Sequence, residues 1–229
     1  MANFYKKSHQ LGRSMIEMLG VLAIIGVLSI AGIAGYTKAM EKWRINKAVQ
    51  QIATAVTNIK TKFINEKNYD GIGYPYEGSN AAHLLSLGII SSDMISDKMV
   101  YGNDSIGSQI VSAFHSAMWI NADDPGDGGR GFTISMSGLH RDECIALASN
   151  DWLELGATSI TLNGDDADTA NYSGYCYNLG RDGISGDQVW GCPNGETVPI
   201  PIPPHIAAQA CSHCNNYDAG CSMVLGFHD

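Results

Sequence analysis

Six cysteines are the residues whose types and spacing could do the most definite chemistry. All lie in the C-terminal half of the chain: Cys144, Cys176, Cys192, Cys211, Cys214 and Cys221. Cys211, His213, Cys214 and Cys221 could hold zinc, because thiolates and imidazole bind this ion tetrahedrally. An even number of cysteines in one part of a chain is also typical of disulfides formed in an oxidising compartment. We favour disulfides over a metal centre.

Two further patterns suggest ligand binding but fit it poorly. Asn163, Asp165, Asp166 and Asp168 could supply oxygen ligands to calcium, yet their spacing is not that of an EF-hand loop, so we expect a solvated acidic loop. The glycines at 126, 128 and 131 match GxGxxG, but the residues that follow, FTISMS, have the pattern of a strand and not of the helix that would meet a pyrophosphate. No catalytic motif is recognisable, so we expect no enzyme activity, cofactor or bound metal.

Glu17 is the most unusual charged residue, because it stands at the entrance of a long apolar stretch. The 19 residues from Met18 to Tyr36 carry no charge, and as a helix they would span about 29 Å, one hydrocarbon core of a bilayer. A carboxylate at membrane depth is costly unless a cation pairs with it. Arg13, four residues earlier on the same helix, could supply that cation at the membrane surface. A secretory signal peptide cut near Ala34 fits less well, because signal cores are shorter and lack an acid at their start.

Gly12, Glu17 and the apolar stretch together resemble the N-terminus of type IV pilin precursors and of the related pseudopilins. The resemblance implies that a prepilin peptidase cuts after Gly12 and that Arg13 becomes the N-methylated first residue of the mature chain. Glu17 is then the fifth residue of the mature chain, where this family has a Glu. In a helical filament the free α-amine of a neighbouring subunit could neutralise this carboxylate and fix the axial register of one subunit against the next. Two positions depart from the family pattern: Arg13 replaces the usual Phe or Met, and Ala34 stands where many pilins have Pro.

Charge is distributed unevenly along the chain. Residues 1 to 67 carry a net charge of +7 and residues 68 to 229 a net charge of −16. An acidic C-terminal part is not suited to binding nucleic acid through its phosphates.

The charges also indicate an orientation in the membrane. Lys6, Lys7 and Arg13 favour a cytoplasmic N-terminus, although basic residues from Lys38 onward weaken the contrast between the two ends of the apolar stretch. The cysteines favour an extracytoplasmic C-terminal part.

Periodicity predicts the elements that position these residues. No proline interrupts Ser14 to Asn65, and after the apolar stretch one face carries apolar residues at spacings of three and four: Ile45, Val49, Ile52, Ala53, Val56, Ile59 and Phe63. We therefore expect a leader over 1–12, a long helix over 13–67 with a transmembrane segment at about 18–36, and an extracytoplasmic head over 68–229. The expected fold is α+β, with the second half of the helix packed on an antiparallel sheet.

Within the head we expect five elements. They are a short helix over Ala81 to Met94, β-like runs over Gln109 to Asn121 and Gly131 to Met136 joined by a polar hairpin loop, and helices over Arg141 to Asn150 and His205 to Cys211. Pro204 suits the first turn of the last helix.

The head is similar to type IVb pilins, in particular the pilins of the thin pili of conjugative plasmids, around Gly88 to Met94 and around the Cys144 helix. That resemblance implies a disulfide between Cys144 and Cys211. We expect the other four cysteines to pair locally, as Cys176–Cys192 and Cys214–Cys221, although six cysteines allow 15 connectivities.

The function these resemblances imply is that of a subunit stored in the bacterial inner membrane and polymerised with its own copies into an extracellular pilus fibre. Its partners would be the prepilin peptidase and the pilus assembly machinery. A type II secretion pseudopilin or a minor pilin is an alternative within the same class. A membrane-tethered extracytoplasmic binding module or enzyme is the alternative from a different class.

Overall fold

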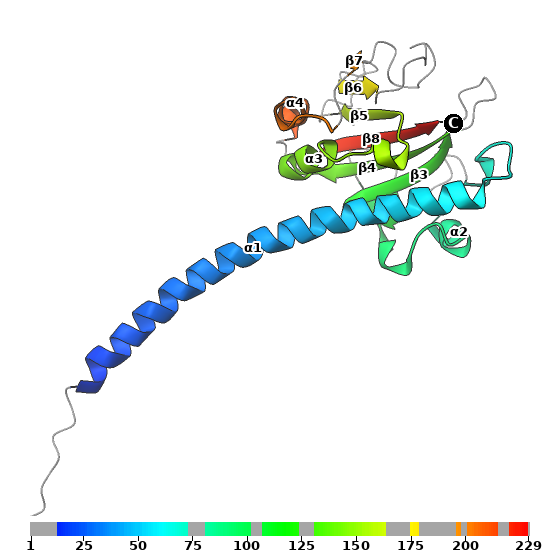
Figure 1. The fold of residues 1–229 in the computed structure, drawn as a ribbon. Helices are drawn as coiled ribbons and strands as arrows, with labels where there is room; N and C mark the ends of the chain where they lie inside the picture. The colour runs from blue at the N-terminus through cyan, green and yellow to red at the C-terminus, as the bar shows by residue number, and fades with distance from the viewer. Residues whose placement is uncertain are drawn as a thin grey trace, which may run out of the picture. The chain divides into compact units, whose positions relative to one another are not determined.

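The computed structural model describes residues 13–72, 81–101, 107–123, 131–163, 175–178, 196–197, 201–214 and 220–228. The chain divides into two compact units, Met1–Trp43 and Arg44–Asp229. The second unit contains a sheet with helices packed on it, so the predicted α+β fold is confirmed (Figure 1).

One helix, α1 (Arg13–Lys62), is 50 residues long and passes from the first unit into the second (Figure 1, blue to cyan). We expected this helix over 13–67, and it ends five residues earlier because the chain turns at residues 63–65. Lys60 and Lys62 lie in its last turn, where cations interact favourably with the carbonyl end of the helix dipole.

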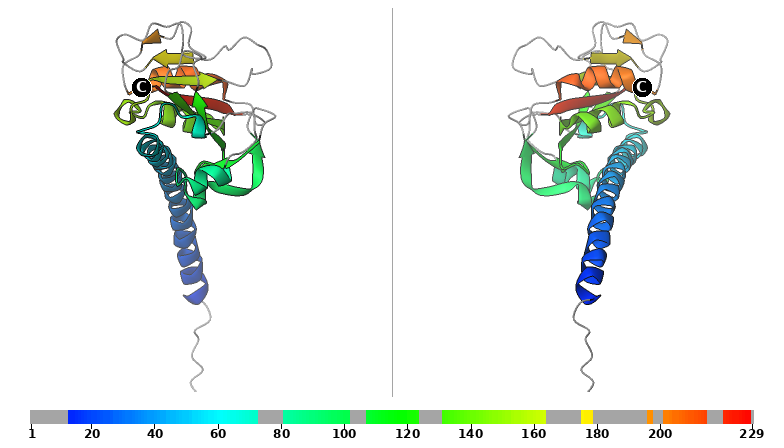
Figure 2. Two further views of the ribbon diagram at one scale, coloured as in Figure 1. Left: turned by 90° about the vertical axis from the view of Figure 1, so that its right-hand side faces the viewer. Right: turned by 90° about the vertical axis from the view of Figure 1, so that its left-hand side faces the viewer.

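Within the described residues, the sheet of the second unit has eight strands in the order β1-β2-β3-β4-β8-β5-β6-β7. Neighbouring strands are antiparallel except β6 and β7, which are parallel. The C-terminal strand β8 lies between β4 and β5, in the middle of the sheet (Figure 2, red). The strands are β1 (Ile95–Tyr101), β2 (Gly107–Val111), β3 (Ala117–Asp123), β4 (Gly131–Leu139), β5 (Ser159–Asn163), β6 (Tyr175–Asn178), β7 (Glu196–Thr197) and β8 (Cys221–His228).

The prediction of one β-like run from Gln109 to Asn121 was wrong. The chain reverses at residues 112–116, so that β2 and β3 pair antiparallel with Ile110 opposite Met118. The Ser112 and Ser116 hydroxyls contact each other across this turn, and His115 adopts a left-handed φ of 63°. No glycine or proline marks the reversal, which is why periodicity alone missed it. The predicted hairpin after it is present, because β3 pairs with β4 up to Asp123 opposite Gly131.

The helix predicted over Ala81 to Met94 is also shorter than expected. Helix α2 (Ala81–Ser86) ends before Gly88, whose φ of +69° is left-handed, and the Ile89 N–H donates to the Leu84 carbonyl. This is the usual way in which a glycine ends a helix. A short 3-10 turn, η2 (Ser92–Met94), and the strand β1 follow it.

The two predicted helices of the C-terminal half are confirmed with small shifts of their ends. Helix α3 (Arg141–Ala148) ends two residues before Asn150, and α4 (Pro204–Ala210) begins at Pro204, the position expected for its first turn. Helices α3 and α4 pack against each other, and α3 also packs against β8 (Figure 2). Three short 3-10 turns complete the fold: η1 (Asp70–Ile72), η3 (Leu153–Leu155) and η4 (Cys211–His213).

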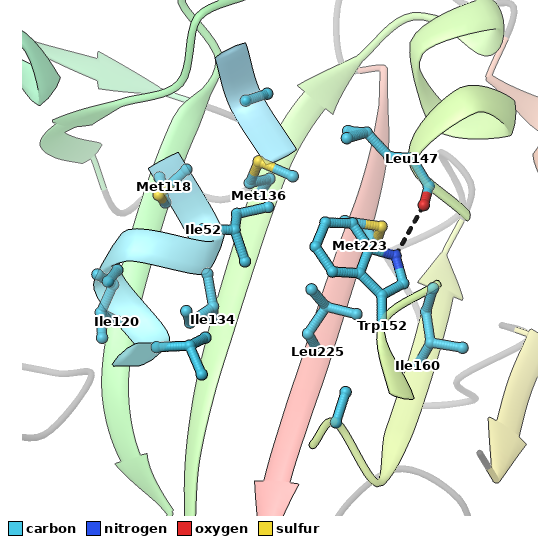
Figure 3. Packing of buried hydrophobic residues seen from close by; sticks show 14 of the residues in the cluster. Ile52, Met118, Ile120, Ile134, Met136, Leu147, Trp152, Ile160, Met223 and Leu225 are labelled. Carbon is cyan, nitrogen blue, oxygen red and sulfur yellow. Dashed lines mark hydrogen bonds between the residues drawn. The ribbon is translucent and has the colours of Figure 1, made fainter. Parts of the chain in front are cut away.

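The core of the second unit lies between the sheet and the apolar stripe of α1. Ile52 is fully buried above β3 and β4, among Met118, Ile120, Ile134 and Met136 (Figure 3). The stripe predicted from spacing is therefore the surface that packs on the sheet.

Trp152 fills the core beside this contact. Its side chain lies over β8 and β5, against Leu225 and Ile160, and is 1% exposed (Figure 3). Its indole Nε1–H donates to the Leu147 carbonyl at 2.7 Å, so the one polar atom of the ring is satisfied. This bond ties the loop after α3 to the helix itself.

Polar side chains of α1 fix the helix along the sheet in addition to the apolar stripe. Sequence reasoning did not identify them, because a single polar residue beside an apolar stripe looks like solvent-exposed helix surface. The Gln51 Oε1 accepts from the Ala113 N–H at 3.0 Å, the Asn58 amide donates to the Gly88 carbonyl at 2.9 Å, and the Lys60 ammonium donates to the Leu155 carbonyl at 3.1 Å.

We expect Ile52→Ala to lower the free energy of unfolding of the second unit by about 3 kcal/mol, because it leaves a cavity in a close-packed core. The measurement is urea unfolding of the full chain in detergent micelles, followed by tryptophan fluorescence. Thr54→Ala is the control, since Thr54 is exposed on the same helix and should change stability by less than about 0.5 kcal/mol. Equal effects of the two substitutions would contradict this packing.

A surface salt bridge joins α1 to η2. The Lys47 ammonium lies 2.6 Å from the Asp93 carboxylate, with the two side chains 35% and 47% exposed. The Lys47 side chain, and after it the Ser91 hydroxyl, hold the pKa of Asp93 below its usual value. Because both groups are partly in water, the pair contributes at most about 1 kcal/mol.

The lowered pKa of Asp93 makes this contribution depend on pH. It is fully present above the unfolded pKa of about 3.9 and is lost as the pH falls through the lower folded pKa. We therefore expect Lys47→Met to be slightly less stable than the unchanged chain at pH 7, with the difference disappearing toward pH 2. Urea unfolding across this pH range measures it, and Lys67→Met, which removes an exposed lysine, is the control. A difference that grows toward acid would contradict the assignment.

Candidate functional site

The N-terminal half of α1 exposes its apolar side chains on every side. From Met15 to Tyr36 every residue is exposed, and no part of the most apolar stretch of the helix is buried. By length and composition this helix could cross a membrane. Fully burying one such Leu or Ile side chain is worth about 1.5–3 kcal/mol. A surface of this kind therefore needs lipid or other protein around it.

Glu17 is exposed on this apolar surface and lies close to the start of α1 at Arg13. The residues one turn further along the helix are Gly20 and Val21, and the next cation in that direction is Lys38, about 31 Å away along the axis. Gly12 and the side chain of Arg13 lie outside the described residues, so the structure gives no geometry for the predicted cut or for a pairing of Arg13 with Glu17. Toward the C-terminus, the apolar half offers Glu17 no cation.

Glycines on the same half leave room for another helix to approach. Nothing lies within 4 Å of a Cβ added at Gly20, Gly26 or Gly32. Small residues at such positions let helix backbones come close together in lipid or in a bundle.

Four cysteines form two disulfides that lie next to each other in the second unit. Cys144 of α3 is bonded to Cys211 of η4, with the Cα atoms 6.0 Å apart. Cys214 is bonded to Cys221 at the start of β8, with the Cα atoms 4.9 Å apart. These are the pairings that the resemblance and the local spacing implied.

Local structure explains how these cysteines come together. The N-terminus of α3 is capped by Glu143, whose carboxylate accepts the His140 N–H at 2.9 Å, and this fixes the direction of the helix that carries Cys144. Gly138 and Gly220 both have left-handed φ angles, of 84° and 63°. A Cβ on Gly220 would lie 2.8 Å from the backbone of Gly138, so only glycine allows the close approach that places Cys221.

The cysteine sulfurs could also be considered as metal ligands. The Sγ atoms of Cys144, Cys211 and Cys214 all lie within 4.8 Å of one another and are buried. Zinc needs thiolates, and each of these sulfurs is in a disulfide. The side chain of His213, the fourth possible ligand, is not among the described residues.

The remaining predicted sites lie outside the part of the chain that the structure describes. This applies to the Cys176–Cys192 pair, since neither side chain is described, and to the acidic loop with Asp165, Asp166 and Asp168. Gly126 and Gly128 are also outside it, whereas Gly131 begins β4, a strand and not the helix that a nucleotide site would need.

Comparison with known proteins gave matches among solved structures. A scan against protein-family models found no match, and neither did a search of curated proteins. The type IVb pilin from Salmonella typhi matches with a TM-score of 0.39 and 17% identity, over 77% of this chain and 97% of that one. TcpA from the Vibrio cholerae El Tor biotype matches with a TM-score of 0.42 and 16% identity, over 80% of this chain and 98% of that one. Both are type IV pilins.

The two disulfides should contribute unequally to stability. They close loops with sequence separations of 67 and 7 residues, for which the loop-entropy model gives about 4 and about 2 kcal/mol. We expect the Cys144→Ala/Cys211→Ala double variant to lose more free energy of unfolding than Cys214→Ala/Cys221→Ala. Urea unfolding under non-reducing conditions measures both, and each variant is the control for the other. The reverse order would show that loop closure does not dominate.

Proposed function

We propose that the chain is the precursor of a type IV pilus structural subunit. In this proposal residues 1–12 are a leader cut off after Gly12, residues of about 18–36 hold the precursor in the inner membrane, and residues 68–229 form an extracytoplasmic head. The cut chain then polymerises through the apolar half of α1 into an extracellular fibre. The observation that supports this most is an apolar helix exposed on every side with a single carboxylate near its start.

Transfer from membrane to fibre exchanges one apolar environment for another. Lipid would cover the side chains from Met18 to Tyr36 before assembly, and the same helix of neighbouring subunits would cover them afterwards. The free space at Gly20, Gly26 and Gly32 suits such close helix contacts. The apolar side chains therefore stay out of water throughout assembly, and little buried apolar surface is lost when neighbouring helices replace lipid.

Glu17 gives this packing its register. Cutting after Gly12 would create a free α-amine at Arg13, the residue at which α1 begins. In an apolar bundle a carboxylate is costly without a cation, and a neighbour's α-amine at the same depth would satisfy it. Only one axial offset between neighbouring helices brings these two groups together, so the ion pair selects that offset. Copies of this chain, the prepilin peptidase and the assembly machinery are the partners that this route requires, and nucleic acid is not among them.

Substitution of Glu17 by Ala tests the assignment. We expect Glu17→Ala to insert into the membrane normally but to form no fibres, because the register-setting pair is lost while the apolar helix is kept. Expression in a host that has a prepilin peptidase and pilus machinery, with electron microscopy of surface fibres, measures this. Glu41→Ala is the matched control, since it removes another exposed carboxylate of α1 outside the apolar stretch.

Two outcomes would contradict the proposal in different ways. Normal fibres from Glu17→Ala would refute the role of this residue alone. A chain that keeps residues 1–12 by mass and stays in the membrane without forming fibres would instead favour a membrane-tethered binding module.

A further inference from the structure

Two large aromatic side chains stand where the apolar stretch of α1 ends. Tyr36 and Trp43 are 65% and 53% exposed. They are seven residues apart, so they project from the same face of the helix within about 20° of each other. Exposing both rings to water is unfavourable, so we expect this segment of the helix to lie in a less polar environment than bulk water.

Basic side chains occupy another face of the same segment. Lys38 and Lys42 are exposed and four residues apart, so they lie one above the other about 200–240° around the helix from Tyr36. Glu41 is the acid between them, and no salt bridge joins it to either lysine in the described part of the chain. The segment from Tyr36 to Trp43 therefore presents aromatic rings on one side and ammonium groups on the other.

The depth of these residues in a bilayer follows from helix geometry. If residues 18 to 36 fill the hydrocarbon core, the Cα of Trp43 lies about 10 Å beyond it along the helix axis. A helical side chain leans back toward the N-terminus, so the indole is directed toward the bilayer. Each headgroup layer is about 5–8 Å thick. The Trp43 ring therefore falls within the headgroup layer, where Trp and Tyr are enriched.

We propose that Tyr36, Lys38, Lys42 and Trp43 form a collar around α1 that binds anionic phospholipid headgroups of the extracytoplasmic leaflet. The inference depends on the proposed storage of the precursor in a membrane. The rings sit between glycerol and headgroup, and the ammonium groups reach outward to the phosphates. Lipid suits this segment better than a second copy, because a second copy would bring like charges on Lys38 and Lys42 together and interface cores are depleted of lysine.

The collar would hold the unassembled precursor at a fixed depth. Axial sliding of the helix would either pull the aromatic rings out of the headgroup layer or push two ammonium groups into hydrocarbon. At the other end of the apolar stretch, axial sliding would likewise draw the charged groups of Glu17 and Arg13 into hydrocarbon, which is costly. Precursors waiting for assembly would then all present Glu17 at one depth.

The experiment uses the full chain reconstituted into vesicles of phosphatidylcholine and phosphatidylglycerol that contain a dansyl label on one lipid or the other. Energy transfer from Trp43 is isolated as the difference between the unchanged chain and Trp43→Phe, because other tryptophans also emit. We expect more transfer to labelled phosphatidylglycerol than to labelled phosphatidylcholine. The preference should fall roughly fivefold for each lysine removed in Lys38→Gln/Lys42→Gln, since one lysine near an anionic surface is worth about 1 kcal/mol. Lys62→Gln/Lys67→Gln is the matched control, because Lys62 ends the helix and Lys67 follows it, both exposed and far from the collar in sequence, and it should keep the preference.

The possible results separate the collar from the proposed function. An inserted chain without preference for the anionic lipid would overturn the collar and leave the pilin assignment standing. Trp43 emission that responds to the protein-to-lipid ratio and not to lipid labels would show that a second copy covers this face, which also overturns the collar. A chain that fails to float with vesicles at all would refute membrane storage and the collar with it.

Discussion

The structure depends on how the apolar surface of one helix, α1, is covered. Along the second half of α1, residues such as Ile52 and Ile59 are fully buried against the chain's own sheet, so a stripe is enough and the other faces can be polar. Along the first half no such cover exists within the described residues, and side chains are exposed on all sides. Folding thus covers the apolar surface of the second half of the helix, whereas the apolar surface of the first half requires lipid or other chains to cover it.

This division also accounts for where polar groups lie along α1. A carboxylate that is costly in an apolar surrounding gains its value from the single place where a cation can meet it. Similarly, Lys60 and Asn58 donate to backbone carbonyls of two connecting segments and so fix the position of the helix in the second unit. In the proposed fibre such fixed distances would matter, because small errors in each copy would add up along its length.

The sheet depends on segments that meet from distant parts of the chain. Strand β8 comes from the last residues described and pairs with β4 on one side and β5 on the other. The bond between Cys144 and Cys211 and the bond between Cys214 and Cys221 lie beside this strand. They restrain the C-terminal segments, which would otherwise depend on strand pairing alone.

By itself, the sequence determined those features whose signal is local. These features are the period of 3.6 in α1, the proline that begins α4, the polar loop between β3 and β4, and the carboxylate at the start of the apolar stretch. Each lies within a few residues of the structure it produces. The tertiary structure alone decided the central position of β8, because its paired residues are 59 to 97 positions away in the chain and the sequence of the strand does not indicate which strands it pairs with. It also decided the reversal between β2 and β3, where serine hydroxyls and His115 take the place of glycine, and the role of Gln51, whose partner lies 62 residues further along. Local periodicity indicates which face of an element is buried, but only the tertiary structure determines which other elements cover that face.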